Sequence, residues 1–323
     1  MTHAIYIDTG TTNTRVWRMR DGEIQAHAET MVGVRDSARE GSTAKLRATL
    51  RDLIAEVQTA ERATEVIAAG MITSALGLVD VPHIPAPAGL AELAAHTRRY
   101  DFPDITPLPV WLVPGVRSGP AACDAQTVAT LDIMRGEETL CAGLVALKIA
   151  PASSTVLNLG SHWKAIQLAA DGRVTASVTS LTGEMIHTTQ TQTILSSAVP
   201  HERLSTLDFA WAQAGLDQAR QAGLPRALFC VRLLEQKGNC TPEERLAFLV
   251  GAFLTADLEG LQHRGLLTPT QQVLITGGGA LAELWERVLK ERNIASRIVT
   301  AAETETAMLT GLRRILERVG TAE

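Results

Sequence analysis

The fold of this chain is decided by two short stretches of sequence, IYIDTGTTNTR at residues 5–15 and TVLNLGSHWK at residues 155–164. When the comparison is extended to residues 5–22 and 155–172, the two copies match without gaps at a constant separation of 150 positions. The matched pairs include Ile7 with Leu157, Asp8 with Asn158, Gly10 with Gly160 and Val16 with Ile166. Each copy reads as an apolar strand, a glycine turn, a second strand and an Asp-Gly turn into a third strand. The internal repeat therefore predicts two β-meanders of the same construction.

Similar element patterns follow each copy. In the first half, the apolar periodicity predicts a helix, two strands and a helix, in order at residues 43–59, 66–69, 110–113 and 136–148. In the second half it predicts helices and strands in alternation, at residues 241–264, 272–275, 280–292, 297–300 and 303–318. A helical insertion near residues 185–238 interrupts the second half, and a proline-rich segment interrupts the first.

Both halves thus read approximately β-β-β-α-β-α-β-α, which is the order of a duplicated actin-like ATPase, or ribonuclease H-like, domain. We therefore expect an α/β fold with mixed sheets. Its N-terminal sugar-kinase-like domain would cover residues 1–150, and its C-terminal ATP-binding domain residues 151–323. In that plan the nucleotide lies in an interdomain cleft, which makes the two glycine hairpins the first places to look for chemistry.

Length and composition exclude several classes of protein. A chain of 323 residues with 46% hydrophobic and 20% charged residues is globular and long enough for two domains. Its net charge of −5 provides no basic field for nucleic acid or for a membrane surface. The apolar stretches are too short to span a membrane, and the start of the chain has no signal-peptide pattern.

The cysteines favour a reducing compartment. The four of them have no CxxC spacing, and three lie in apolar or helical-looking contexts, which favours buried thiols over zinc ligands or disulfide bridges. We therefore expect a cytoplasmic protein. The sequence does not decide the oligomeric state, and a homodimer stays open.

The turn of the first stretch suits a phosphate group. Gly10 permits close approach of an anion, while Thr11, Thr12 and Asn13 supply N–H and side-chain donors. Asp8 ends a buried strand, where a carboxylate needs a partner, and a hydrated Mg²⁺ would provide one. Capping of the turn is the alternative role for Asp8.

The second turn differs from the first in its charges. Asn158 replaces the acid, Gly160 and Ser161 form the turn, and His162 and Lys164 follow it. We expect this hairpin to bind the phosphates of ATP, with Lys164 on a phosphoryl group or a substrate carboxylate. The alternatives are a solvated surface lysine and a turn histidine whose ring is satisfied locally.

A third glycine segment follows an apolar strand of the second half. Gly277, Gly278 and Gly279 open a helix, so that a flat ring or a phosphate can touch the main chain. Neither a complete GxGxxG pattern nor a Walker A motif is present in the sequence. In the second half of a duplicated actin-like plan, these glycines fall where adenosine should bind.

Acidic residues before an apolar helix are candidates for the catalytic base. Glu137 and Glu138 open the helix, and Asp132 and Arg135 precede them. One of the three acids could deprotonate a sugar hydroxyl while Arg135 holds an anion. The alternative is that the two glutamates only stabilise the helix through its dipole.

Together these motifs resemble the 2-dehydro-3-deoxygalactonokinase family along nearly the whole chain. The matching pieces are residues 7–17, 69–72, 114–116, 133–139 (IMRGEET), 160–164 and 182–184. The resemblance implies ATP-dependent phosphorylation of 2-dehydro-3-deoxy-D-galactonate on its 6-hydroxyl, a step of galactonate catabolism. It also implies that the segment after Met71 contacts the sugar.

The sugar acid would be held by a further group of residues. An anionic substrate requires cationic or amide donors, and the candidates for this site are Arg15, Gly70, Met71, Ser74 and Arg117. The segment 73–78 is apolar where the family has polar residues and a tryptophan, so a kinase for another keto or acidic sugar is the first alternative. A non-metabolic actin-like ATPase is the second.

Overall fold

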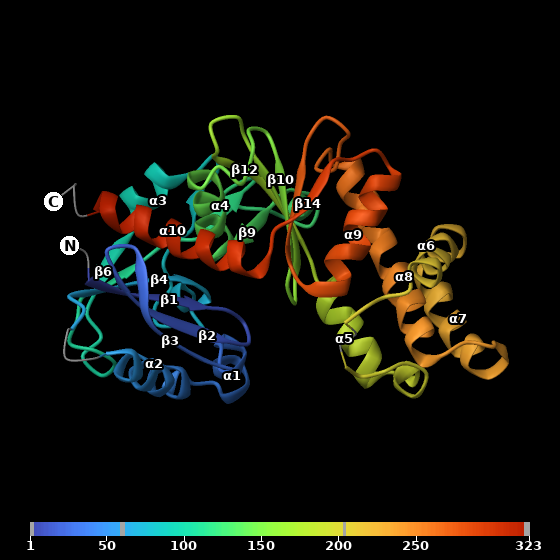
Figure 1. The fold of residues 1–323 in the computed structure, drawn as a ribbon, viewed down its shortest axis with the longest axis horizontal. Coiled ribbons are helices and arrows are strands. Elements are labelled where there is room, and N and C mark those ends of the chain that lie inside the picture. Colours follow the sequence, from blue (N-terminus) through green and yellow to red (C-terminus); the bar gives the residue numbers. More distant parts are fainter. Residues whose placement is uncertain (1–2, 59–61, 203–204, 320–323) are drawn as a thin grey trace. The chain divides into compact units, whose positions relative to one another are not determined.

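The computed structural model describes residues 3–58, 62–202 and 205–319, which form two compact units (Figure 1). The first unit contains the described residues up to Ala152, the segment Ala169–Ala176 and the residues from Glu303 onward. The second unit contains Ser153–Leu168 and Ser177–Ala302. This division differs from the expected one after residue 150 in two segments, because 169–176 and most of the C-terminal helix pack within the first unit.

The first unit is built on a sheet that has six strands in the described part of the chain, in the order β3-β2-β1-β4-β7-β6. The strands are β1 (His3–Thr9), β2 (Thr14–Arg20), β3 (Glu23–Thr30), β4 (Glu65–Gly70), β6 (Arg98–Tyr100) and β7 (Val110–Leu112). Alternate residues of a strand share a face, so Ile5 and Ile7 enter one core cluster with Leu46 and Leu50 of α2 (Ala44–Val57).

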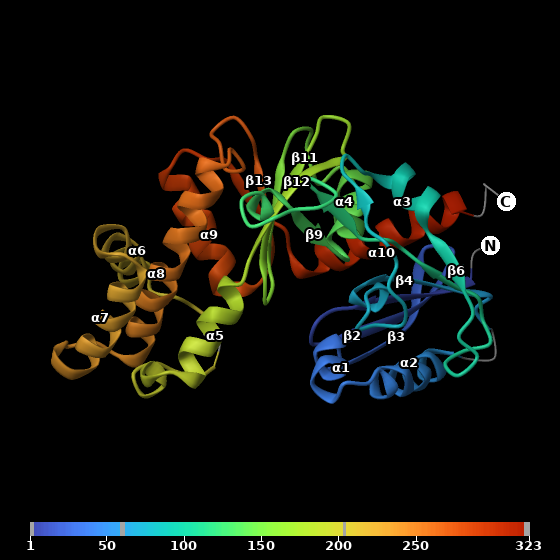
Figure 2. The same ribbon diagram turned by 180° about the vertical axis from the view of Figure 1, so that it is seen from behind.

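A smaller sheet and four more helices complete the first unit. The sheet has the order β5-β8-β9, with strands Ile84–Pro85, Val116–Ser118 and Asp132–Met134. The helices are α1 (Val34–Glu40), α3 (Leu90–His96), α4 (Glu137–Ala146) and α10 (Ala301–Val319). Helices α4 and α10 lie side by side (Figures 1 and 2), and a Cβ at Gly311 would stand 2.1 Å from the carbonyl oxygen of Thr139.

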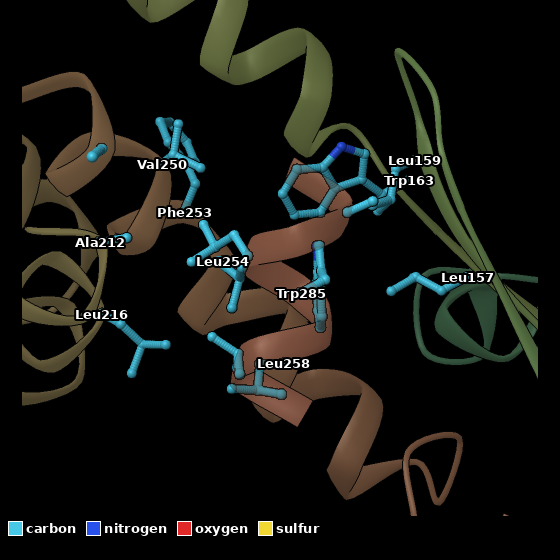
Figure 3. Packing of buried hydrophobic residues seen from close by; sticks show 14 of the residues in the cluster. Leu157, Leu159, Trp163, Ala212, Leu216, Val250, Phe253, Leu254, Leu258 and Trp285 are labelled. Carbon is cyan, nitrogen blue, oxygen red and sulfur yellow. The ribbon is translucent and has the colours of Figure 1, made fainter. Parts of the chain in front are cut away.

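The second unit has a sheet of similar construction, in the order β12-β11-β10-β13-β14. The strands are β10 (Thr155–Leu159), β11 (Trp163–Leu168), β12 (Val174–Ser180), β13 (Val273–Gly277) and β14 (Ser296–Ile298). Its core packs against α8 (Pro242–His263) and α9 (Gly279–Glu291). The rings of Trp163 and Trp285 meet edge to face in this core, with centroids 5.8 Å apart (Figure 3).

Three helices occupy the region where a helical insertion was expected. They are α5 (Thr182–Gln192), α6 (Phe209–Ala222) and α7 (Leu224–Lys237). Helices α6 and α8 approach closely because each has a glycine at the contact: a Cβ at Gly215 or at Gly251 would stand 1.9 Å from a carbonyl oxygen of the other helix. Among the described residues, no helix has the length and hydrophobicity that crossing a membrane requires.

The two central sheets confirm the internal repeat. In both units the first strand runs antiparallel to the second and parallel to the fourth, and Asp8 and Asn158 occupy the same place in their sheets. Asp8 lies opposite Arg15, whereas Asn158 lies opposite Lys164. The second turn is thus one residue shorter, and the gapless pairing of Val16 with Ile166 is wrong by one position.

Candidate active site

The first glycine hairpin is a closed, well-supported turn. The Gly10 N–H donates to the carbonyl oxygen of Asn13 at 2.9 Å, and the hydroxyl of Thr14 donates to the carbonyl oxygen of Val32 at 2.8 Å. Gly33 approaches from the start of α1, where a Cβ would stand 2.6 Å from the backbone of residues 11 and 12. Only glycine fits at this contact, so the turn is fixed by backbone against backbone.

The hairpin keeps hydrogen-bond donors for a ligand. Within the described parts of the chain, the backbone N–H groups of Thr11, Thr12 and Asn13 have no backbone acceptor. Successive N–H groups in a glycine turn form a concave site for an anion. The geometry therefore agrees with the predicted phosphate site at residues 10–13.

Asp8 is the acid at the base of this hairpin. Its side chain is 21% exposed, and its Oδ2 lies 3.9 Å from Nη1 of Arg15. Burial raises the pKa of Asp8 to about 6, Arg15 acts in the opposite direction, and the charge of Glu137 raises it further. Asp8 and Glu137 therefore interact electrostatically, although 129 positions separate them in the sequence.

Two glycines bring Glu137 to Asp8. A Cβ at Gly70, where φ is +89°, would stand 2.5 Å from the carbonyl oxygen of Thr9 and 3.1 Å from Oδ1 of Asp8. A Cβ at Gly136, where φ is +104°, would stand 3.2 Å from Cα of Gly70. Both backbone conformations favour glycine. The end of β4 and the start of α4 can thus approach the acid closely.

The structure separates the two adjacent glutamates. Glu138 is 2% exposed, and its two carboxylate oxygens accept the Gly136 N–H at 2.8 and 3.0 Å. Burial raises the pKa of Glu138 to about 7, and the neighbouring Glu137 adds to the increase. The buried carboxylate of Glu138 therefore caps the N-terminus of its own helix. Glu137 is partly exposed, and it is the residue whose charge acts on Asp8.

Arg135 is engaged by the protein itself. Its guanidinium donates to Oγ1 of Thr73, Oδ1 of Asp80 and the carbonyl oxygen of Val81, at 3.0, 3.0 and 2.9 Å. The side chain is 7% exposed, and burial lowers its pKa. These contacts join the start of α4 to the loop after β4. In this geometry the arginine holds the loop, and its expected role in holding an anion stays a prediction.

Asp132 lies on a strand of the smaller sheet, before the helix that Glu137 begins. It begins β9, where it stands opposite Ser118 of β8. The charge of Glu137 raises the pKa of Asp8. Among the three acids that the sequence offered, Glu137 is the one that the described structure places beside the hairpin.

The residues expected to bind the sugar are spread over three elements. Gly70 and Met71 lie where β4 passes into a short 3₁₀ turn (Met71–Thr73), and the Ser74 hydroxyl donates to the carbonyl oxygen of Met71 at 2.7 Å. Arg117 on β8 donates to the carbonyl oxygen of Gly119 at 2.8 Å, so it stabilises the loop that follows its own strand. Arg15 is 43% exposed beside Asp8 and Glu29.

In the second unit, the hairpin has the same kind of support from glycine. A Cβ at Gly183, near the start of α5, would stand 2.6 Å from the carbonyl oxygens of Gly160 and Ser161. The ring nitrogen Nε2 of His162 lies 3.2 Å from Oε2 of Glu184. Lys164 is 5% exposed, so it is not a solvated surface lysine.

The triple glycine lies where β13 passes into α9. A Cβ at Gly277, where φ is +86°, would stand 2.7 Å from the carbonyl oxygen of Leu159. Gly278 caps the helix and Gly279 begins it, and the space where their Cβ atoms would lie is open. Open backbone at a helix N-terminus suits an anion or a flat ring, in agreement with the predicted role.

The glycine contacts extend the repeat beyond the stretch that revealed it. Gly33 and Gly183 are again 150 positions apart, and each packs on its own hairpin. Gly70 and Gly277 stand opposite Thr9 and Leu159, which form another pair of the repeat. We did not single out Gly33, Gly183 or Glu184 as site residues from the sequence. Gly33 and Gly183 could have been found by extending the gapless repeat, with its separation of 150 positions, as far as residue 33.

The donor set at the first hairpin fits Mg²⁺ bound together with phosphates. No cluster of three or more His, Cys, Asp or Glu side chains suitable for a metal occurs among the described residues. Mg²⁺ is commonly held by one or two carboxylates, water and substrate phosphates, so a single acid suffices. Asp8 is such an acid, since it is largely buried with one cation at 3.9 Å.

Comparison with known proteins agrees with this geometry. The chain is 29% identical to a probable 2-dehydro-3-deoxygalactonokinase of Rhizobium meliloti (strain 1021) over 96% of both chains. It is 26% identical to the 2-dehydro-3-deoxygalactonokinase of Escherichia coli (strain K12) over 98% of both. The solved structure of a candidate 2-dehydro-3-deoxygalactonokinase from Sinorhizobium meliloti has a TM-score of 0.77 and 25% identity, over 97% of this chain and 96% of that one.

A more distant solved structure bears on the fold alone. The activator of 2-hydroxyisocaproyl-CoA dehydratase from Clostridium difficile, solved with bound ADPNP, has a TM-score of 0.54 and 12% identity over 99% of this chain and 97% of that one. Together with the duplicated sheets, it confirms the predicted actin-like α/β fold. The profile of the 2-keto-3-deoxy-galactonokinase family matches residues 8–315. The chain belongs to this family, and it is a carbohydrate kinase.

Proposed function

We propose that the protein transfers the γ-phosphoryl group of ATP to the 6-hydroxyl of 2-dehydro-3-deoxy-D-galactonate. The observation that carries the proposal is the approach of Glu137, at the start of α4, to Asp8 at the base of the first hairpin. A general base beside a metal- and phosphate-binding acid is what phosphoryl transfer to an alcohol requires. Family membership supplies the sugar acid as the acceptor.

The residues of the first unit have distinct roles in this reaction. The N–H groups of residues 11–13 donate to phosphate oxygens. Asp8 would hold the Mg²⁺ that accompanies ATP, and the bound ion would supply positive charge to neutralise the phosphates. Glu137 accepts the proton of the sugar hydroxyl while that oxygen bonds to the γ-phosphorus and the bond to ADP breaks.

The second unit contributes its own phosphate and adenosine groups. Its hairpin offers Ser161, His162 and the largely buried Lys164, and the glycines before α9 offer open backbone. Asn158 stands where the first unit has Asp8, so an amide replaces the acid at this place in the sheet. We assign it to phosphate binding without Mg²⁺. We also propose that the protein is cytoplasmic, in keeping with its use of ATP.

The sugar acid is proposed to lie near the loop after β4. Arg15 is the exposed cation beside the hairpin, and Gly70 and Met71 begin the loop that Arg135 holds. The apolar segment 73–78 leaves the identity of the sugar to be tested. The direct test is a coupled ADP-release screen over 2-keto-3-deoxy sugar acids and neutral ketoses. Release with 2-dehydro-3-deoxy-D-galactonate and a phosphate on C6 in the product support the proposal. Absence of acid-stimulated release would overturn it.

The assignment of the base is tested by a matched pair of variants. Glu137→Gln should lower kcat by about 10²–10⁴-fold, the usual contribution of a general base, with little change in KM for ATP. Glu138→Gln keeps an oxygen for the Gly136 N–H and should retain kcat within about tenfold. Equal loss of turnover in both variants, or a larger loss in Glu138→Gln, would contradict the assignment.

A further inference from the structure

The start of α5 sets the position of the second hairpin. Gly183 packs so closely that a Cβ would stand 2.6 Å from the carbonyl oxygens of Gly160 and Ser161. One residue later, the carboxylate of Glu184 lies 3.2 Å from the ring of His162. A displacement of this helix start would therefore move the backbone that we assign to phosphate binding.

The first unit secures the corresponding helix start locally. There, the N–H of Gly33 donates to Oδ2 of Asp36 at 3.1 Å, and Asp36 also binds Lys45 at 2.8 Å. Helix α5 is different, because its N-cap residue is Leu181, whose side chain is apolar and 55% exposed. A leucine cannot accept the N–H groups of the first turn. The start of α5 needs another anchor.

Asp257 of α8 supplies that anchor. Oγ of Ser180 lies 3.0 Å from Oδ2 of Asp257 and 3.0 Å from Oγ1 of Thr182, and the hydroxyl of Thr182 also bonds to the carboxylate. A carboxylate can only accept, so the Thr182 hydroxyl donates to Asp257, and Ser180 donates its single proton to Asp257 or to Thr182. Asp257 thus ties together the end of β12 and the first residue of α5.

The part of α8 that carries Asp257 is packed firmly in the core of the second unit. Leu254 and Leu258, which flank Asp257 by one turn or less, are fully buried in the core of the second unit (Figure 3). Asp257 and Ser180 also line a cavity of about 10 Å³ together with Leu157 and Trp163, which lie on the two strands of the hairpin. Burial raises the pKa of Asp257, as expected for a carboxylate that has hydroxyl partners but no cation.

We propose that Asp257 is a positioning residue for ATP binding, which fixes the hairpin 160–162 through Ser180, Thr182 and the start of α5. This inference rests on the proposed function, because it takes the hairpin to bind phosphate. Asp257 itself does not touch the nucleotide. Its effect should therefore appear in nucleotide affinity and leave the affinity for the sugar acid nearly unchanged.

The experiment compares Asp257→Ala, Asp257→Asn and the control Glu259→Ala in the full chain. Glu259 lies on the same helix but pairs with Arg220 of α6 at 2.9 Å. We expect Asp257→Ala to raise Kd for Mg-ADPNP in calorimetry, and KM for ATP, by about tenfold, the usual effect of one lost buried hydrogen bond to a charged group. Asp257→Asn keeps an acceptor for the hydroxyls and should recover most of that loss. Glu259→Ala should match wild type.

Unchanged nucleotide affinity in a folded Asp257→Ala variant, or an equal increase of KM for both substrates, would overturn the inference. If Asp257→Ala does not fold, Ser180→Ala removes one donor only and must raise Kd for Mg-ADPNP by at least about threefold. The proposed function and the role of Asp257 can be refuted independently of one another. A wild-type protein that binds Mg-ADPNP but phosphorylates no sugar acid refutes the proposed function, while the calorimetry of the variants still decides the role of Asp257.

Discussion

Asp8, near the end of the inner strand β1, has a pKa above the usual range of an aspartate. Burial raises its pKa to about 6, Arg15 opposes the increase, and Glu137 adds to it. A carboxylate must be deprotonated to ligate a cation, so the raised pKa links metal binding to pH near neutrality. Because burial removes hydration from the carboxylate, a bound cation stabilises the charged form of Asp8.

The pH dependence of turnover should report this acid. We expect kcat/KM for Mg-ATP to fall as pH decreases through about 6, because the protonated Asp8 no longer holds the ion. Arg15→Gln removes the cation that lowers this pKa, so its acid limb should move to higher pH. Asp8→Asn should abolish turnover at every pH while circular dichroism shows a retained fold. A wild-type profile that stays flat down to pH 5 would contradict the assignment.

Glu138 should make the folded state sensitive to pH. Its pKa is raised from 4.5 to about 7 in the fold, so the folded state holds the proton more tightly than the unfolded chain. The resulting stabilisation is complete below about pH 4.5 and is lost as pH rises through 7.

The variant Glu138→Gln lacks this titration. Its free energy of unfolding relative to wild type should therefore increase between pH 4.5 and pH 7 by roughly 1–3 kcal/mol. Urea titrations at both pH values measure the change. A constant difference between the two proteins would show that the carboxyl does not titrate in this range.

At the scale of elements, each hairpin depends on the glycine that begins the next helix. A Cβ at Gly33 or Gly183 would stand 2.6 Å from backbone atoms of its hairpin, which cannot move without shifting the turn. The two contacts occupy equivalent places in the repeat, so their loss should have similar consequences for ATP.

The variants Gly33→Ala and Gly183→Ala test this dependence. Each should raise KM for ATP by about tenfold or more, since a misplaced donor loses its hydrogen bond to phosphate. Gly260→Ala is the control, because the space beside Gly260 is open and alanine favours the helix. Steady-state kinetics with saturating sugar acid measure the effect. Wild-type KM for ATP in both hairpin variants would refute backbone contact as the reason for these glycines.

At the scale of the whole chain, the last helix returns to the first unit. Helix α10 follows β14 of the second unit, yet its residues from Glu303 onward pack in the first unit. Gly311 allows it to contact α4 at Thr139, next to Glu138. The helix that carries the proposed base is therefore supported by a segment about 170 positions away in the sequence.

The contact between α4 and α10 gives a prediction for stability. In Gly311→Ala the new Cβ would stand 2.1 Å from the carbonyl oxygen of Thr139, which should destabilise the fold by about 1–3 kcal/mol. A scan by differential calorimetry should show a Tm lower by several degrees. Gly260→Ala again serves as the control. An unchanged Tm would mean that the two helices can separate at no cost.

Much of the fold and part of the site could be predicted from local patterns. Strand alternation, glycine turns and apolar helical periodicity depend on neighbouring residues, so the repeat and the hairpin at Asp8 were accessible from the sequence. The gapless comparison failed at Val16 because one residue is missing from the second turn, and a turn can lose a residue without changing the strands beside it. The role of Arg135 was also inaccessible, since its partners lie between 54 and 62 positions earlier.

The sequence by itself determined the duplicated plan, the two glycine hairpins and the membership in a kinase family. Only the tertiary structure distinguishes Glu138, which is buried and accepts the Gly136 N–H, from Glu137, which we propose as the base, because adjacent acids look alike in the sequence. It also shows that most of α10 packs in the first unit and that Ser180 donates to Asp257 of α8. The physical reason is the same in each case: burial and hydrogen bonding between distant segments depend on packing, which no local pattern records.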